Sequence, residues 1–159
     1  MSIRECVQCS AETKTKNRCK NITCVYSEFC AIHTKQLFDL AIKPSNIKES
    51  GKGLYTFVAI KKGDKIAKYT GKMMSDEEFE ANPSPYALAV KKNTLIDARS
   101  TQSSLARYAN SCRRGDNCKG NNSKFSISHR TNPPTVWLKA TKNIKAGEEI
   151  YVPYGKAYW

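Results

Sequence analysis

The chain has 159 residues and a mass of 17.9 kDa, enough for one domain with a hydrophobic core and one small additional module. Its hydrophobic fraction of 40% excludes a fully disordered chain, and no apolar stretch is long enough for a transmembrane helix. The N-terminus lacks the apolar segment of a secretion signal, so we expect an intracellular protein without a membrane partner.

The chain is strongly basic, with 27 lysines and arginines against 14 acidic residues and a formal net charge of +13. Such a surface attracts nucleic acids and other polyanions. The basic residues are spread along the chain and form no DNA- or RNA-binding signature. Two interpretations remain open: solvated surface charge with non-specific nucleic-acid affinity, or a dedicated nucleic-acid-binding protein.

Five of the seven cysteines fall within the first thirty residues, and His33 closes this cluster. An odd cysteine count in an intracellular protein argues against a disulfide framework. Zinc prefers four thiolate or imidazole ligands, and the pairs Cys6–Cys9 and Cys30–His33 have the spacing of half a site. The segment is too short and polar to fold without a metal. Six candidates compete for four positions: Cys6, Cys9, Cys19, Cys24, Cys30 and His33.

The following segments, taken in chain order, predict a mostly β domain with little helix. We expect a helical turn at Leu37–Leu40 and another at 104–108. Ser75 opens a short acidic helix through a capping box, and Pro83 ends it. Two strands flank residues 91–93 as a hairpin. Apolar, β-branched or alternating runs predict strands at 54–60, 65–69, 86–90, 94–96, 125–128 and 136–140.

One short pattern, I-K-x-G-acid-x-I, occurs twice, at residues 60–66 and 144–150. Each copy predicts a turn between two strands with its isoleucines on one face. Two copies do not make a solenoid, so we expect two similar hairpins in one domain. Glu148 and Glu149 of the second copy point to opposite faces of a strand, and we interpret them as turn or surface residues. The polar loop that precedes this copy holds Cys112 and Cys118, which could add a second metal pair.

Five motifs occur in an order that resembles the SET-domain protein lysine methyltransferases. Each motif alone is weak, but the succession is specific and covers residues 41–159. The resemblance implies small curved β-sheets and a knot-like crossing, in which the C-terminal segment threads beneath a preceding loop. The motifs are GKGLY at 51–55, YTG at 69–71, IDA at 96–98, ARYAN at 106–110 and GEEI-x3-YG at 147–155.

Residues 1–40 resemble the small Cys/His module of some virus-encoded SET proteins. The resemblance implies a zinc-stabilised module ahead of a methyltransferase domain at 41–159. A virus-encoded protein of this kind would act in the host nucleus or cytoplasm. The pattern favours four ligands over Cys6 and Cys24, namely Cys9, Cys19, Cys30 and His33.

The resemblance also implies S-adenosylmethionine as the methyl donor and a protein lysine as the acceptor. The family's cofactor-binding backbone falls on Lys52, Gly53 and Leu54, and its adenine-binding asparagine on Asn110. Ser111 stands where the family usually has a histidine, so one hydrogen bond to the cofactor is missing from the pattern. Two further residues fall near the cofactor in this comparison, Tyr86 and Arg107.

Methyl transfer to lysine needs a narrow apolar channel, because only the neutral amine attacks and free lysine has a pKa of about 10.4. Tyrosines suit such a channel because each offers an apolar wall and one hydroxyl. By the resemblance, Tyr154 matches the catalytic tyrosine, and Tyr69 and Tyr86 line the channel. Val152 stands where the family often has a larger aromatic residue, which predicts room for di- or trimethyl-lysine.

The expected substrate is a basic protein with an exposed lysine, and a histone tail by family analogy. The family's C-terminal cysteine-rich segment is missing, so we expect Tyr158–Trp159 or the partner subunit of a homodimer to close the channel. No Ser/His/Asp set, phosphate-binding loop or HExxH motif occurs. The alternative function is a zinc-stabilised nucleic-acid-binding module with a degenerate methyltransferase fold.

Overall fold

The computed structural model describes residues 4–24 and 28–154, which form short strands and three short helices. The helices are α1 (Ala31–Phe38), α2 (Asp76–Ala81) and the 3-10 helix η1 (Ala106–Tyr108). No helix in this part of the chain is long and apolar enough to cross a bilayer. The strands are β1 (Val7–Gln8), β2 (Ile22–Thr23), β3 (Leu40–Pro44), β4 (Lys52–Thr56), β5 (Lys65–Tyr69), β6 (Lys72–Met74), β7 (Ala87–Lys91), β8 (Thr94–Asp97), β9 (Ser123–Ser128), β10 (Thr135–Ala140) and β11 (Glu149–Ile150).

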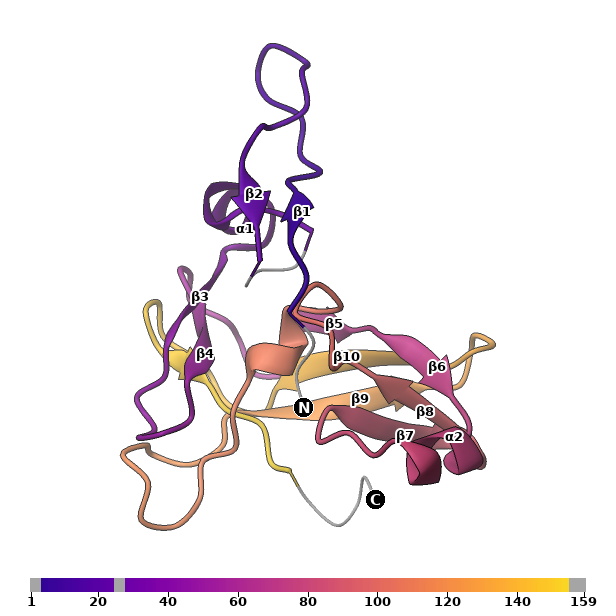
Figure 1. The fold of residues 1–159 in the computed structure, drawn as a ribbon. Coiled ribbons are helices and arrows are strands. Elements are labelled where there is room, and N and C mark those ends of the chain that lie inside the picture. Colours follow the sequence, from indigo (N-terminus) through magenta and orange to yellow (C-terminus); the bar gives the residue numbers. More distant parts are fainter. Residues whose placement is uncertain (1–3, 25–27, 155–159) are drawn as a thin grey trace.

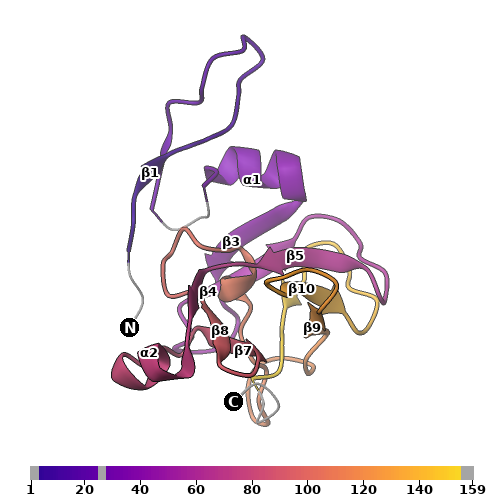
Figure 2. The ribbon, with the colours of Figure 1, turned by 90° about the vertical axis from the view of Figure 1, so that its right-hand side faces the viewer.

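Strands β3 to β11 form three small antiparallel sheets around one hydrophobic core (Figures 1 and 2). The strand orders are β5-β10-β9, β11-β4-β3 and β6-β8-β7. In β10, Val136 and Leu138 are completely buried, whereas their neighbours Trp137 and Lys139 are partly exposed. This alternation is that of a sheet with one face on the core and one face toward solvent. The predicted mostly β fold of small sheets is confirmed.

The two copies of the I-K-x-G-acid-x-I pattern pair with each other. Ile60 and Ile144 exchange two backbone hydrogen bonds of 2.8 Å each. Gly63 and Gly147 occupy equivalent turn positions with φ angles of 92° and 87°, which glycine adopts without a steric penalty. Each turn connects two different sheets, β4 to β5 and β10 to β11, so the prediction of two hairpins is wrong. Each copy instead forms a turn that carries the chain from one sheet to the other, and the two turns pair with each other at Ile60 and Ile144.

The N-terminal segment stands apart from the three sheets and contains β1, β2 and α1 (Figure 1). The helical turn predicted at Leu37–Leu40 is wrong in its second half, because Asp39 has a φ of 55° and ends α1. Leu40 already belongs to β3, which pairs with β4. The helix begins directly after Cys30, and no side chain caps its first turn. A helix without a cap has no start signal in the sequence.

The other predicted elements are mostly confirmed. The capping box at Ser75 forms as expected, with reciprocal hydrogen bonds to Glu78. The hairpin β7–β8 turns at Asn93, whose φ of 54° asparagine tolerates better than most residues. The strand predicted at 54–60 ends at Thr56, because its hydroxyl bonds to the backbone of Val58 and turns the chain.

The C-terminal segment crosses between two earlier segments. On one side, the Val152 N–H donates to the Asn110 carbonyl over 2.9 Å. On the other side, the Tyr151 carbonyl accepts hydrogen bonds from the N–H groups of Asn122 and Ser123 over 3.1 and 3.0 Å. These contacts hold Tyr151 and Val152 between the segment that follows η1 and the start of β9, which brings motifs distant in the sequence together. Tyr158–Trp159, expected to close the channel, lie outside the described residues.

Candidate active site and metal centre

A small aromatic pocket lies where β5, β9, η1 and the C-terminal segment meet. Its volume is about 30 Å³. All three tyrosines expected in the channel line it, so residues far apart in the sequence converge on one point. The lining residues are Tyr69, Pro85, Tyr86, Ala87, Leu88, Ala106, Arg107, Phe125 and Tyr154.

Tyr154 turns its hydroxyl inward while the residue as a whole stays 48% exposed. The hydroxyl donates a hydrogen bond to the backbone carbonyl of Ala109. Burial of the phenol, followed by its proximity to Tyr86, raises the pKa of Tyr154 to about 12. At neutral pH the residue is therefore a fixed hydrogen-bond donor and no base.

Tyr69 and Tyr86 form the opposite wall of the pocket. The Tyr69 hydroxyl donates to the Tyr86 carbonyl, and its ring meets Phe125 edge to face with centroids 5.0 Å apart. Burial, followed by the nearby Tyr154, raises the pKa of Tyr69. The hydroxyls of Tyr69 and Tyr154 thus remain protonated over the whole physiological range. Their acceptors are backbone carbonyls, which hold these two rings in one orientation.

Arg107 closes the inner end of the pocket. Its guanidinium lies 4.1 Å from the centroid of the Tyr86 ring and 4.7 Å from that of Tyr108. Its Nε donates to the Ala98 carbonyl over 2.7 Å, and the residue is only 6% exposed. The structure therefore places Arg107 as a buried support of the aromatic walls.

The residues whose backbone is expected to bind the cofactor lie at the start of β4, where Asn110 contacts them. Asn110 donates through Nδ2 to the Lys52 carbonyl over 2.8 Å, which joins the first and fourth motifs. Ser111 accepts a hydrogen bond from the Tyr154 N–H over 3.3 Å. Gly53 and Leu54 continue from Lys52 within the same strand. One short stretch of backbone thus links these residues to the aromatic pocket.

A second cluster, in the N-terminal segment, consists of three thiols and an imidazole. The Sγ atoms of Cys9, Cys19 and Cys30 and one ring nitrogen of His33 all lie within 4.8 Å of one another. His33 Nδ1 lies 3.5 Å from Cys9 Sγ and 3.3 Å from Cys30 Sγ. A tetrahedral zinc with Zn–S of about 2.3 Å and Zn–N of about 2.0–2.1 Å needs S···N separations of about 3.5 Å. The donor set and its spacing therefore fit zinc.

The thiol of Cys30 is tuned toward the ligating thiolate form. Burial opposes the charged form, but hydrogen bonds from the Asn21 side chain and from His33 lower the pKa of Cys30 to about 6. At the neighbouring Cys19, the Asn21 backbone favours the thiolate, but burial and the nearby Cys9 thiol outweigh it and raise the pKa. A bound cation reverses that balance, because metal coordination favours thiolates.

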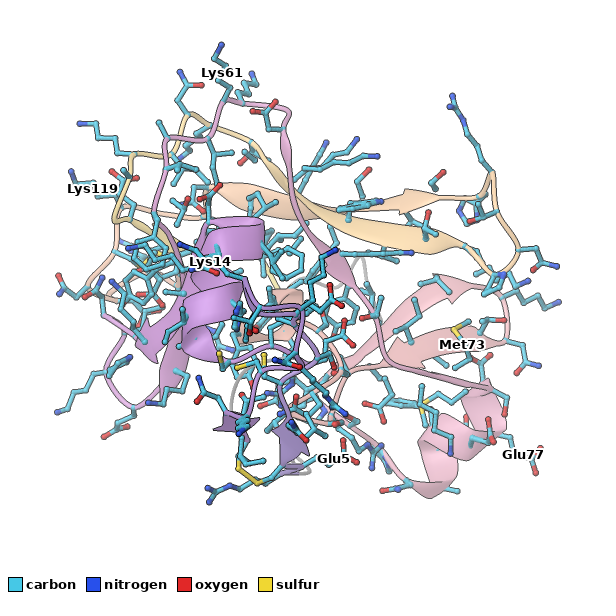
Figure 3. The ribbon with its side chains drawn as sticks, turned by 90° about the horizontal axis from the view of Figure 1, so that it is seen from above. Glu5, Lys14, Lys61, Met73, Glu77 and Lys119 are labelled. Carbon is cyan, nitrogen blue, oxygen red and sulfur yellow. A yellow bond between two sulfur atoms is a disulfide. The ribbon has the colours of Figure 1, made fainter. Side chains whose placement is uncertain are left out.

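The four remaining cysteines form two disulfides, Cys6–Cys24 and Cys112–Cys118. The expectation of free or metal-bound thiols is wrong for these residues, because each pair lies close enough in the fold to bond. Cys112 and Cys118 therefore form no second metal pair. The disulfides also leave three free cysteines for the Cys/His cluster, all of them buried (Figure 3 draws sulfur in yellow).

The model of the SET domain matches residues 51–155, which hold the whole aromatic pocket and all five motifs. The chain belongs to the SET-domain family. Two curated relatives, from Mus musculus and Homo sapiens, are named histone-lysine N-methyltransferase, H3 lysine-36 specific. Each is 32% identical to this SET-domain chain over 115 residues, which cover 67% of this chain and 4% of the relative. The chain thus spans a small part of their length.

Solved structures share the SET-domain fold. One is described as ctPRC2 in an autoinhibited conformation bound to S-adenosylmethionine, with a TM-score of 0.63 and 24% identity. The match covers 75% of this chain and 15% of that one. Another, an active polycomb repressive complex 2 in the basal state, has a TM-score of 0.62 and 25% identity, covering 74% and 15% of the two chains.

One functional feature of this SET domain was missed in the sequence. Glu149, interpreted as a turn or surface residue, is 3% exposed and accepts four hydrogen bonds. The donors are the Ser45 hydroxyl at 2.6 Å, the Asn46 N–H at 2.8 Å, and the hydroxyls of Tyr55 and Tyr151 at 3.2 and 2.8 Å. Glu148 beside it is exposed. The expectation that the two side chains point to opposite faces was therefore the one sequence signal that could have assigned Glu149 to the interior.

Glu149 also explains Gly53. A Cβ at Gly53 would lie 2.2 Å from Glu149 Oε1, so no larger side chain fits without moving the carboxylate. Burial, followed by the charge of Glu149, raises the pKa of Tyr55 to about 12, which keeps this phenol a donor. The carboxylate thus fixes the loop that leads into the GKGLY motif at 51–55.

Proposed function

We propose that the protein transfers methyl groups from S-adenosylmethionine to the side-chain amine of lysine in a basic protein. The observation that carries the proposal is the pocket of three tyrosines built from motifs far apart in the sequence. Its walls are mostly apolar, the hydroxyls of Tyr69 and Tyr154 are protonated donors, and no thiol or carboxylate nucleophile is among its lining residues. Such a pocket suits an in-line transfer that needs alignment and desolvation but no covalent intermediate.

S-adenosylmethionine, when bound, supplies an activated methyl group and a positive charge. The residues of this chain do the rest. Apolar walls formed by Tyr69, Tyr86 and Phe125 disfavour a charged ammonium, which shifts the substrate lysine toward its reactive neutral form. Backbone carbonyls beside the pocket, such as that of Ala109, orient the amine with the help of the Tyr154 hydroxyl. Tyr154, Tyr69 and Tyr86 are the proposed catalytic residues.

The proposed cofactor site lies next to this pocket, at the junction of β4 with the segment after η1. The Lys52 carbonyl and the Asn110 amide meet there, and Ser111 links the same place to Tyr154. Polar backbone and amide groups beside a buried aromatic wall fit a ligand with an amino acid end and a nucleoside end. The proposed cofactor-binding residues are Lys52, Gly53, Leu54, Tyr86, Arg107, Asn110 and Ser111.

We propose further that zinc binds Cys9, Cys19, Cys30 and His33 and stabilises a module at residues 1–40 ahead of the methyltransferase domain at 41–159. The geometry of the four donors supports this ligand set. A zinc ion with four protein ligands has no open position, so its role is structural.

A histone tail is the proposed substrate, and the nucleus the proposed location. The support is the curated relatives' name, histone-lysine N-methyltransferase. The proposed link to virus-encoded proteins rests on the Cys/His pattern alone.

Calorimetric titration of the zinc-loaded protein with S-adenosylmethionine tests the proposal. Binding with one site per chain, followed by label transfer to lysine peptides on an array, supports it. No heat of binding overturns it and favours the alternative, a nucleic-acid-binding module with a degenerate methyltransferase fold.

A further inference from the structure

Three lysines from three strands form a row across the outer face of the β5-β10-β9 sheet. Lys139 lies opposite Lys124 of β9 on one side and opposite Lys65 of β5 on the other. We call Lys65, Lys124 and Lys139 the lysine row. Lys139 follows the completely buried Leu138, which faces the core, so the lysine row belongs to the solvent face of the sheet.

The lysine row costs the fold stability. Neighbouring strands are about 4.7–4.9 Å apart, and like charges directly opposite each other on a sheet are destabilising. In the part of the chain that the structure describes, the one ion pair joins Arg99 to Asp97, so no carboxylate neutralises the lysine row. The nearest acid along the chain, Asp64, accepts a hydrogen bond from the Lys61 N–H instead. An arrangement that opposes folding is expected at functional sites, and for a row of positive charges the matching function is a ligand of opposite charge.

The surroundings of the lysine row extend its positive field. Lys61 and Lys62 lie in the turn before β5, and Lys68 lies further along the strand. Acidic residues concentrate on α2, and Figure 3 shows Glu77 of α2 at the opposite end of the molecule from Lys61. Two acidic groups lie near this face: Asp64 in the turn before β5, and Glu28, which lines a cleft of about 470 Å³ beside Lys68.

We propose that this face binds the phosphate backbone of duplex DNA. Lysine is a mobile point charge that suits phosphates, and a duplex carries one charge per about 1.7 Å of its axis. Trp137, the aromatic residue of the face, has the Lys65 ammonium 4.8 Å from its ring centroid, so this ring face does not stack on a single-stranded base. The remaining outward residues of the sheet are serines and threonines, without the arginine, asparagine or glutamine pairs that read bases. The binding is therefore independent of sequence.

Fluorescence anisotropy with a labelled 20-base-pair duplex of mixed sequence tests this, over a series of salt concentrations. The variant Lys65→Gln/Lys124→Gln/Lys139→Gln is expected to bind at least tenfold more weakly than the parent chain. Its slope of log affinity against log salt falls by up to about 2.7, since each phosphate contact contributes about 0.9. Methylation of a short free peptide stays unchanged, which separates this proposal from the proposed function.

The matched control is Lys14→Gln/Lys72→Gln/Lys92→Gln, which removes the same charge from exposed lysines outside this face. Equal affinities and equal salt slopes for the two triple variants would overturn the proposal. A third variant, Lys139→Glu, sets a carboxylate between Lys65 and Lys124 and is expected to raise the melting temperature while weakening DNA binding. Parent-like DNA binding by Lys139→Glu would also overturn it.

Discussion

The Tyr154 hydroxyl donates a hydrogen bond to the carbonyl of Ala109, a residue 45 positions earlier in the chain. This bond joins the C-terminal segment to the end of η1, whose Arg107 supports the aromatic walls. We predict that Tyr154→Phe lowers kcat by about 10²–10³, the usual effect of removing one oriented donor. The Kd for S-adenosylmethionine should change less than twofold, because the hydroxyl acts on the amine and the transition state.

Single-turnover methylation and calorimetry measure the two quantities. Tyr108→Phe is the control, since it removes a hydroxyl that bonds to the Thr101 carbonyl away from the pocket. It should change kcat less than about threefold. Full activity in Tyr154→Phe would remove this tyrosine from the mechanism.

The raised pKa values of Tyr55 and Tyr154, both about 12, predict a stability limit at alkaline pH. An unfolded tyrosine ionises near pH 10, whereas the folded protein holds these protons up to about pH 12. Below pH 10 the stabilisation is fully present. Between about pH 10 and 12 the unfolded state binds fewer protons than the folded state, so the free energy of unfolding falls. Urea unfolding at pH 8, 10 and 11 checks this, and Tyr55→Phe should reduce the alkaline loss.

Substitution of Glu149 should reduce both stability and cofactor affinity. Glu149→Gln replaces a buried carboxylate that holds four donors, and hydrogen bonds to charged groups contribute about 1.5–3 kcal/mol each. We expect the free energy of unfolding to fall by about 2–3 kcal/mol. Because the loop at Ser45 and Asn46 is released, the Kd for S-adenosylmethionine should rise several-fold.

Glu148→Gln provides the control for that variant, since Glu148 is the exposed residue directly before β11. A change of about 0.5 kcal/mol or less is expected there. Equal effects of the two substitutions would show that burial of the Glu149 carboxylate is irrelevant. Urea unfolding and calorimetry supply both measurements.

Removal of zinc should unfold the N-terminal segment and spare most of the β-sheets. The Cys/His cluster holds that segment's small buried core, which is separate from the main core. Chelation should therefore produce a partial loss of circular dichroism, with bound zinc falling from one ion per chain to none. Cys19→Ser should abolish stoichiometric zinc binding, whereas Cys6→Ser, at a disulfide position, should retain it. A single transition that unfolds the whole chain would contradict the independence of the two parts.

The sequence predicted six of the strands and the capping box because their signals are local, but it did not predict β3 or β6. It did not predict the disulfides of Cys6 and Cys112, because disulfide partners are determined by proximity in the fold. It also missed Glu149, whose four donors come from three separate parts of the chain. The tyrosines of the pocket were predicted from the order of the family motifs. No local pattern could have predicted them, because they meet only where distant segments cross.

The degree of methylation depends on the space around the amine. By the resemblance, Val152 stands where the family often has a larger aromatic residue; it is completely buried in the main core and is not among the residues that line the tyrosine pocket. Two tyrosines considered as alternatives for that place have their hydroxyls held elsewhere: that of Tyr151 by Glu149 over 2.8 Å, and that of Tyr69 by the Tyr86 carbonyl. The pocket keeps about 30 Å³, more than the ~10–15 Å³ that one water-sized group needs.

We therefore predict that the enzyme produces di- or trimethyl-lysine. Mass spectrometry of a peptide driven to completion under excess S-adenosylmethionine measures the product. Val152→Tyr restores a ring and a hydroxyl at the position where the family often has a larger aromatic residue and should stop the reaction at monomethyl-lysine, whereas Val152→Leu, without a hydroxyl, should still pass the first step. A parent chain that stalls at monomethyl-lysine would refute the prediction. A Val152→Tyr variant that still trimethylates would show that another residue limits the space.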